Sequence, residues 1–140
     1  MKTRHIIVIS FLIFMTAAGL SQAGPAAEKT AVKAAEAWLA LIDGSKYGES
    51  WTEAAVLFKN AVTKDQWSGQ VKEVREPLGR MLKRTVVSKQ YTKTLSGAPD
   101  GEYVVIQFDT SFENKKNATE TVTPMLDKGG KWRVSGYYIR

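Results

Sequence analysis

The hydrophobic period of this sequence changes once, near residue 80, and the change limits the folds open to the chain. Before it, apolar residues recur three and four positions apart, as on one face of a helix; the first such set is Ala31, Ala35, Trp38, Leu41 and Ile42. After it, apolar and polar residues alternate, as in a half-buried strand, most clearly in "YVVIQFDTSF". Helices followed by a run of strands predict an α+β fold with the helices on one face of an antiparallel sheet.

We expect three N-terminal helices packed on a curved four-stranded antiparallel sheet. One helix ends near Gly44, a second covers Tyr47–Val62, and a third begins with a capping box at Thr63 and Gln66 and ends before Pro77. The expected strands cover residues 84–95, 103–113, 119–126 and 132–140, with a polar turn over residues 114–118. Pro124 indicates an edge strand or a bulge, and Gly136 indicates a bulge or a tight bend.

Residues 1–23 have the pattern of a cleavable signal peptide. The positive start "MKTRH" precedes the apolar run "IIVISFLIFMTAAGL", and Ser21 and Ala23 supply small residues at the cleavage site. The alternative, a retained membrane anchor, is not favoured because the run is shorter than the ~20 residues of a spanning helix. We expect cleavage after Ala23. The product would be a single α+β domain of residues 24–140, periplasmic or secreted, without a stable membrane anchor.

Two absences restrict the chemistry of that domain. The chain has no cysteine, and its one histidine, His5, lies in the predicted signal peptide. The mature domain therefore lacks a Ser-His-Asp or Cys-His nucleophile system and a His-ligated metal site. Only carboxylates, tyrosines and lysines remain for proton transfer. With no phosphate-binding loop or metal-spaced cluster, we expect no metal and no cofactor.

The charge of the mature domain does not indicate nucleic-acid binding. Removal of Lys2 and Arg4 lowers the formal net charge from +6 to +4. The densest basic region is an expected basic surface made of Arg80, Lys83, Arg84 and Lys89. These residues could contact an anionic lipid, a glycan or an acidic protein. We favour the simpler interpretation, a solvated helix end whose positive charge suits the helix dipole.

Asp109 is the sharpest candidate for a site. Strand alternation places it on the same face as Tyr103 and Val105, opposite a more apolar face. We interpret the face of Asp109 as the outer surface of the sheet. In the reverse orientation, Asp109 and Tyr103 would form a buried acid and hydrogen-bond donor suited to proton abstraction beside a carbonyl. The candidate pocket would then comprise Asp109, Tyr103, Tyr91 and Trp51.

Most of the aromatic residues, the tryptophans above all, fit a core better than a ligand pocket, because their spacing is that of buried helix and strand positions. The adjacent Tyr137 and Tyr138 must face opposite sides of their strand, so one of them is expected to be exposed or at an interface.

Several longer segments carry a resemblance. They are "AWLALIDGSKYGESW", "VREPLG", "GAPDGEYVVIQFDTSFENK", "ETVTPM" and "WRVSGYYIR". From about residue 30 to residue 140 the chain resembles the exported bacterial domain-of-unknown-function family 4019. It is also similar to the nuclear transport factor 2-like, or cystatin-like, cone folds, in which helices pack into a curved sheet. That group includes isomerases, dehydratases, small-molecule binders and protein-binding modules, so the resemblance implies no role for any residue here.

These observations favour a non-enzymatic role in binding or protein interaction in the cell envelope. The expected partner is an envelope protein or a second copy of the chain, docked through the outer sheet face at Tyr103, Val105 and Gln107. The alternative is a small-molecule or acid-base pocket of isomerase or hydratase type between the helices and the sheet.

Overall fold

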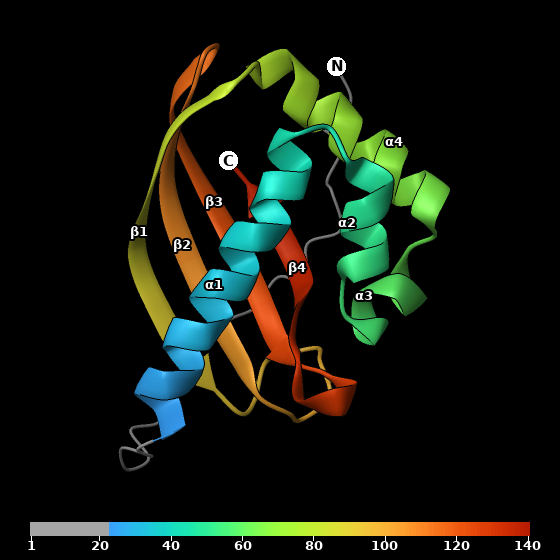
Figure 1. Cartoon of the computed structure of the whole chain (residues 1–140), viewed down its shortest axis with the longest axis vertical. Helices are drawn as coiled ribbons and strands as arrows, with labels where there is room; N and C mark the ends of the chain where they lie inside the picture. Colours follow the sequence, from blue (N-terminus) through green and yellow to red (C-terminus); the bar gives the residue numbers. More distant parts are fainter. Residues whose placement is uncertain (1–22) are drawn as a thin grey trace.

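The computed structural model describes residues 23–140 and consists of a four-stranded antiparallel sheet with helices on one face (Figure 1). The predicted signal peptide falls almost wholly on residues outside this range. The elements are, in order, α1 (Ala23–Asp43), α2 (Tyr47–Glu53), α3 (Val56–Ala61), α4 (Lys64–Arg75), a 3-10 helix (Glu76–Leu78), β1 (Met81–Thr92), β2 (Tyr103–Phe112), β3 (Lys115–Leu126), a 3-10 turn (Lys128–Gly130) and β4 (Trp132–Ile139). The strands pair in sequence order, β1-β2-β3-β4. The predicted α+β class is therefore confirmed.

The segment predicted as one helix over Tyr47–Val62 is instead two helices, α2 and α3, so that prediction is wrong. Ala54 and Ala55 separate them in extended backbone and are both fully buried. The backbone N–H of Ala55 donates to the carbonyl of Val134 in β4 at 2.8 Å. A contact with the sheet edge thus outweighs the helix preference of two alanines. As a result, part of the edge of β4 is covered.

The capping box predicted at the start of the third helix is confirmed, whereas the turn predicted over residues 114–118 differs from the structure. Thr63 and Gln66 form a capping box at the start of α4, with both reciprocal hydrogen bonds present. The turn between β2 and β3 is shorter than predicted and is made by Glu113 and Asn114. Both backbone amides donate to the chain just before β1, to the carbonyls of Arg80 and Leu78 respectively. These bonds let β3 begin at Lys115, four residues earlier than expected.

The bulge predicted near Gly136 is confirmed, and it involves Pro124. The register moves from the pair Thr123–Gly136 to the pair Pro124–Val134, which leaves Ser135 unopposed. The Ser135 hydroxyl donates to the carbonyl of Thr123 at 2.7 Å. An edge position for Pro124 is wrong, because β3 lies between β2 and β4.

The main core lies between the inner face of the sheet and the helices. The apolar face of β2 is buried as predicted: Val104, Ile106, Phe108 and Phe112 are each at most 1% exposed. Opposite them, α1 contributes Trp38, which contacts the rings of Phe58, Trp67 and Tyr137 at centroid distances of 5.4 to 6.5 Å. No helix within residues 23–140 has the length and apolar character needed to cross a membrane.

A second, smaller core lies on the outer face of the sheet. Leu95, Tyr103 and Val105 are buried there by the loop that joins β1 to β2. The Tyr103 hydroxyl donates to the carbonyl of Pro99 in this loop at 2.6 Å. Tyr103 and Val105 are therefore on the predicted face but are not at the surface, because the loop folds back over them. Gln107, the third residue expected at a dimer interface, remains partly exposed.

Candidate functional site

A carboxylate is buried inside the domain, where it accepts hydrogen bonds from three side chains. Glu120 of β3 is fully buried. Its Oε1 accepts from Arg84 Nε at 2.7 Å and from the Thr110 hydroxyl at 2.5 Å. Its Oε2 accepts from the Tyr137 hydroxyl and from a second nitrogen of Arg84 at 3.3 Å. Both oxygens are thus held by donors from β1, β2 and β4.

The network extends from Arg84 into the helices. Arg84 binds Asp43, the last residue of α1, through two nitrogens at 2.7 and 3.0 Å. Asp43 also accepts from Arg75, at the end of α4, at 3.3 Å. Arg75 is 4% exposed, and its guanidinium lies 4.4 Å from the ring centre of Phe112. We call this set the buried charge network; it comprises Asp43, Arg75, Arg84, Thr110, Glu120 and Tyr137.

The electrostatics of the buried charge network favour the protonated forms of Tyr137 and Arg84. Burial, together with the adjacent carboxylate of Glu120, raises the pKa of Tyr137 well above its usual value, so the phenol stays neutral and donates. Burial alone would lower the pKa of Arg84, but hydrogen bonds to Asp43 and Glu120 outweigh burial and raise it above its usual value. Two guanidinium groups balance two carboxylates. The arrangement leaves Glu120 no free oxygen for accepting a substrate proton, and it suits stabilisation better than catalysis.

Sequence reasoning missed the buried charge network because its members are far apart in the chain. A signal was present: Thr110 and Glu120 occupy inward positions of β2 and β3, where neighbouring inward residues are apolar. A polar pair at inward strand positions requires a buried partner. That partner is Arg84, which is 10% exposed and points to the interior. This placement removes Arg84 from the expected basic surface.

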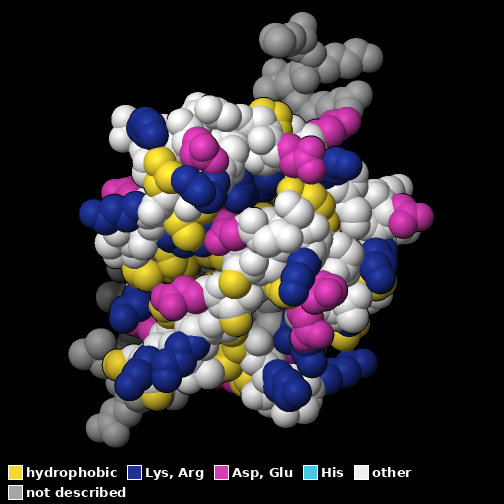
Figure 2. Space-filling model, turned by 45° about the horizontal axis from the view of Figure 1, so that its top comes forward, with side chains coloured by type: hydrophobic (Ala, Val, Ile, Leu, Met, Phe, Trp, Pro, Cys, Tyr) yellow, Lys and Arg dark blue, Asp and Glu magenta, His cyan; other side chains and the backbone are white. Residues whose placement is uncertain are grey.

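The remaining residues of that surface do not form a patch of one sign. Arg80 is 78% exposed and lies beside Glu113, whose Oε1 accepts from the backbone N–H of Arg80 at 2.7 Å. Lys83 and Lys89 are exposed positions of β1. On the face shown in Figure 2, positive and negative side chains alternate with small apolar areas. This mixture favours the simpler interpretation of a solvated surface.

The four residues of the candidate pocket lie in different places. Asp109 is exposed on the outer face of the sheet, whereas Tyr103 lies under the β1–β2 loop. The Tyr91 hydroxyl donates to Glu102 at 2.7 Å, and burial together with this bond raises the pKa of Tyr91 to about 12. Trp51 of α2 donates its indole N–H to the carbonyl of Val62 at 2.7 Å. Of the two grooves described among residues 23–140, one is lined by Asp109 and the other by none of the four.

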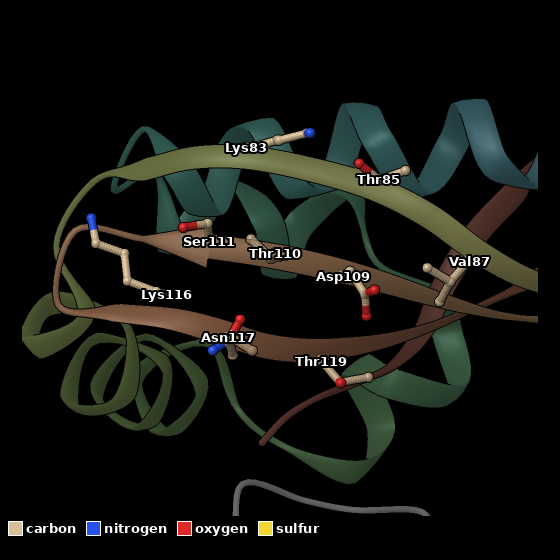
Figure 3. Close-up of a pocket in the computed structure, with 10 residues that line it drawn as sticks. Lys83, Thr85, Val87, Asp109, Thr110, Ser111, Lys116, Asn117 and Thr119 are labelled. Atoms are coloured by element: carbon tan, nitrogen blue, oxygen red, sulfur yellow. The ribbon is translucent and has the colours of Figure 1, made fainter.

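Asp109 does line a groove of about 430 Å³, which we call the outer-face groove (Figure 3). Strand pairing places Thr85, Asp109 and Thr119 side by side across β1, β2 and β3. Lys83 and Lys116 project away from the centre of the groove, while Asp109 projects from β2 between the two neighbouring strands. The lining is mostly hydroxyl, amide and charged side chains.

Ligands for a bound metal ion do not converge in the part of the chain that the structure describes. Across residues 23–140 there is no group of three or more carboxylate, histidine or cysteine side chains that could hold an ion. The outer-face groove itself contributes one carboxylate, that of Asp109.

Comparison with known proteins agrees with the resemblance seen in the sequence. A family model described as a protein of unknown function, DUF4019, matches residues 34–137. No curated protein and no solved structure matches the chain. The cone fold of nuclear transport factor 2-like proteins is compatible with this architecture and stays a prediction. Since the match covers most of the chain, the protein belongs to the DUF4019 family of proteins of unknown function.

Proposed function

We propose that this domain acts by binding a protein partner in the cell envelope and does not catalyse a reaction. The contact surface is the outer-face groove. The observation that carries the proposal is the contrast between the two polar regions of the molecule. The buried charge network is satisfied internally, whereas the groove presents polar side chains from three strands to solvent.

The composition of the outer-face groove suits a partner of mixed polarity. Asp109 lies near its centre, and Lys83 and Lys116 belong to its rim. Hydroxyl and amide groups such as those of Thr119 and Asn117 can both donate and accept. An extended polypeptide carries the matching donors, acceptors and charges. Electrostatic complementarity of this kind contributes mainly to specificity and to the rate of association.

The acid-base alternative requires Asp109 to act as a general base in this same groove. Asp109 is exposed, and the groove opens to solvent on the outer face of the sheet. A carboxylate in contact with solvent lacks the dry environment that catalysis of this type uses. A second copy of the chain remains an alternative partner, although Tyr103 and Val105 cannot take part while the β1–β2 loop covers them.

Site-specific photo-crosslinking in the producing cells tests the proposal. A crosslinking amino acid placed at Thr85 or Thr119 reports on the groove, and one at Glu36, an exposed position of α1, is the matched control. We expect one discrete protein adduct from the two groove positions and none from Glu36. Asp109→Lys should reduce that adduct. An adduct pattern that is the same for all three positions would contradict the proposal.

Cell fractionation tests the envelope location separately. The signal-like N-terminus is the support for export, and cleavage after Ala23 would leave a chain that begins at Gly24. Mass spectrometry of the protein recovered from the envelope fraction should show that N-terminus. An uncleaved chain found in the cytoplasm would contradict the location, whatever the crosslinking shows.

A further inference from the structure

A second groove, which we call the helix-side groove, lies between α1 and β4 on the opposite side of the sheet from the outer-face groove. Its volume is about 380 Å³, within the roughly 300–1,000 Å³ typical of small-ligand sites. Figure 1 shows β4 behind the space between α1 and the α2–α3 pair. The lining comes from one face of α1, from Glu53 at the end of α2, and from residues 131–134 at the start of β4.

The walls of the helix-side groove are apolar. Trp38 and Val134 belong to the main core and are 3% and 1% exposed. Ala34 and Ala37 lie one helical turn apart on α1, and their short side chains leave room that longer residues would fill. Trp132 adds a half-buried aromatic ring. An apolar group of a ligand would find both aliphatic and aromatic surface here.

One of the charged side chains that line the groove has no partner of opposite charge among the described residues. Glu53 is paired with Arg133 at 3.5 Å, and Arg133 also donates to the backbone carbonyl of Glu53 at 3.3 Å. Lys131 is exposed, and no carboxylate within residues 23–140 pairs with it. Arg133 is also near the carboxylate of Asp127, so Lys131 is the groove cation left without a carboxylate partner among the described residues. An anionic group would balance Lys131.

The tryptophans supply an independent observation. The indole N–H groups of Trp38 and Trp67 both donate to Ser50, and that of Trp51 donates to Val62. Trp132, the fourth tryptophan of the chain, donates to no group within residues 23–140. Trp132 lines the groove, as Lys131 does. An indole donor and a cation that line one groove, both without a partner among residues 23–140, suit a carboxylate.

We propose that the helix-side groove binds a small amphipathic carboxylate, with its apolar part against α1 and Trp132 and its carboxylate near Lys131. This site goes beyond the protein interaction proposed above, because it lies on another face and takes a different class of ligand. It uses no residue of the outer-face groove or of the buried charge network.

Titration of the mature domain with 3-phenylpropionate, followed by NMR, tests the proposal. We expect saturable shifts of the Trp132 indole and the backbone amides of Lys131 and Val134, with the Trp51 indole unmoved. Two comparison compounds separate the contributions: 3-phenylpropanamide lacks the charge, and acetate lacks the apolar part. Both should bind more weakly than 3-phenylpropionate.

Matched variants locate the site. Ala37→Leu should fill the groove and remove the saturable shifts, whereas Ala40→Leu, at an exposed position of the same helix outside the groove, should leave them intact. Lys131→Gln should weaken binding roughly two- to fivefold, as expected for one exposed ion pair. Lys128→Gln in the same turn is its control.

Three results would overturn the proposal. One is the absence of saturable shifts at Trp132. Another is equal binding of the acid and the amide. The third is equal binding by the Ala37→Leu and Ala40→Leu variants, which would place the ligand elsewhere.

Discussion

The carboxylate of Glu120 has no access to water, so its solvation comes entirely from three side chains. Arg84 supplies opposite charge, and Thr110 and Tyr137 supply hydroxyl donors. In an environment of low polarity, each donor is worth more than it would be at the surface, and its loss leaves the charge partly unsolvated. The stability of the domain should therefore depend strongly on single atoms around Glu120.

Tyr137→Phe removes one such atom while keeping the ring. The ring packs against Trp38 at a centroid distance of 5.4 Å, so the core contact is retained and the hydroxyl alone is lost. We expect the free energy of unfolding to fall by about 1.5–3 kcal/mol, the range for a hydrogen bond to a charged group. Urea denaturation measures the change.

The neighbouring Tyr138 is the control for this substitution. Tyr137 is 2% exposed, whereas Tyr138 is only partly buried, so the predicted opposite orientation of the two residues is confirmed. Tyr138→Phe should change stability by no more than about 0.5 kcal/mol. Equal losses in the two variants would show that the bond to Glu120 is not what stabilises the core.

At the scale of elements, the sequence predicted the features that depend on residues close together in the chain. These features are the capping box at Thr63, the apolar face of β2 and the bulge beside Gly136. What was missed depends on contacts across the fold. Alanine favours a helix, yet Ala55 is extended because its N–H bonds to β4. Alternation placed Tyr103 on the outer face but could not show the loop that covers it.

In the candidate site too, the sequence did not predict contacts between residues that are far apart in the chain. A basic residue near others in the sequence indicates a charged surface, and for Arg84 that interpretation is wrong. Its burial follows from two carboxylates, Asp43 and Glu120, that are 41 and 36 positions away in the sequence. A single sequence gives no measure of such distant pairing, whereas a polar residue at an inward strand position does signal that some partner exists.

The turn between β3 and β4 also holds a helix in place. Asp127 accepts from the backbone N–H of Val56, the first residue of α3, at 3.0 Å and from that of Lys128 at 2.8 Å. Burial alone would raise the pKa of Asp127, but these two bonds, with help from Arg133 and Lys59, lower it below the ordinary value. The charged form of Asp127 is therefore favoured by folding.

Asp127→Ala should lower the free energy of unfolding by about 0.5–2 kcal/mol at neutral pH, as for a lost helix cap. A lowered pKa contributes stability above the unfolded value of ~3.9, and that contribution is lost as the pH falls through the folded value. The difference in the free energy of unfolding between the wild type and Asp127→Ala should thus become smaller below about pH 4.

Urea denaturation at several pH values measures this difference. Asp100→Ala, at an exposed position of the β1–β2 loop, is the control and should show a much smaller effect at neutral pH. A difference for Asp127→Ala that stays constant down to about pH 3, below the unfolded pKa of an aspartate, would mean that the charge of Asp127 plays no part.

At the scale of the whole molecule, the buried charge network joins the two layers of the fold. Asp43 and Arg75 end α1 and α4, and Arg84, Thr110, Glu120 and Tyr137 come one from each strand. Close packing of the core, the Ala55 bond to β4 and the Val56 bond to Asp127 already oppose a shift of the helix layer over the sheet. Paired charges with fixed geometry add to this resistance, since any displacement separates them in a medium that penalises unpaired charge.

This interpretation predicts that the charges act as a unit. Arg84→Met leaves two carboxylates facing one guanidinium and should cost about 3–5 kcal/mol. In the double variant Arg84→Met with Glu120→Gln, the remaining Asp43 and Arg75 balance each other, and the amide introduced in place of the Glu120 carboxylate can still bond to Thr110 and Tyr137. The free energy of unfolding should therefore fall less in the double variant than the sum of its decreases in the two single variants, by about 1 kcal/mol or more.

Urea denaturation of the four proteins in this cycle gives the coupling energy directly. Lys83→Met, which changes the exposed neighbour of Arg84 on the same strand, serves as the control and should cost no more than about 0.5 kcal/mol. Additive losses would mean that Arg84 and Glu120 contribute independently. The fixed position of the helices over the sheet would then have to come from packing around Trp38 and Phe108, and not from the charges.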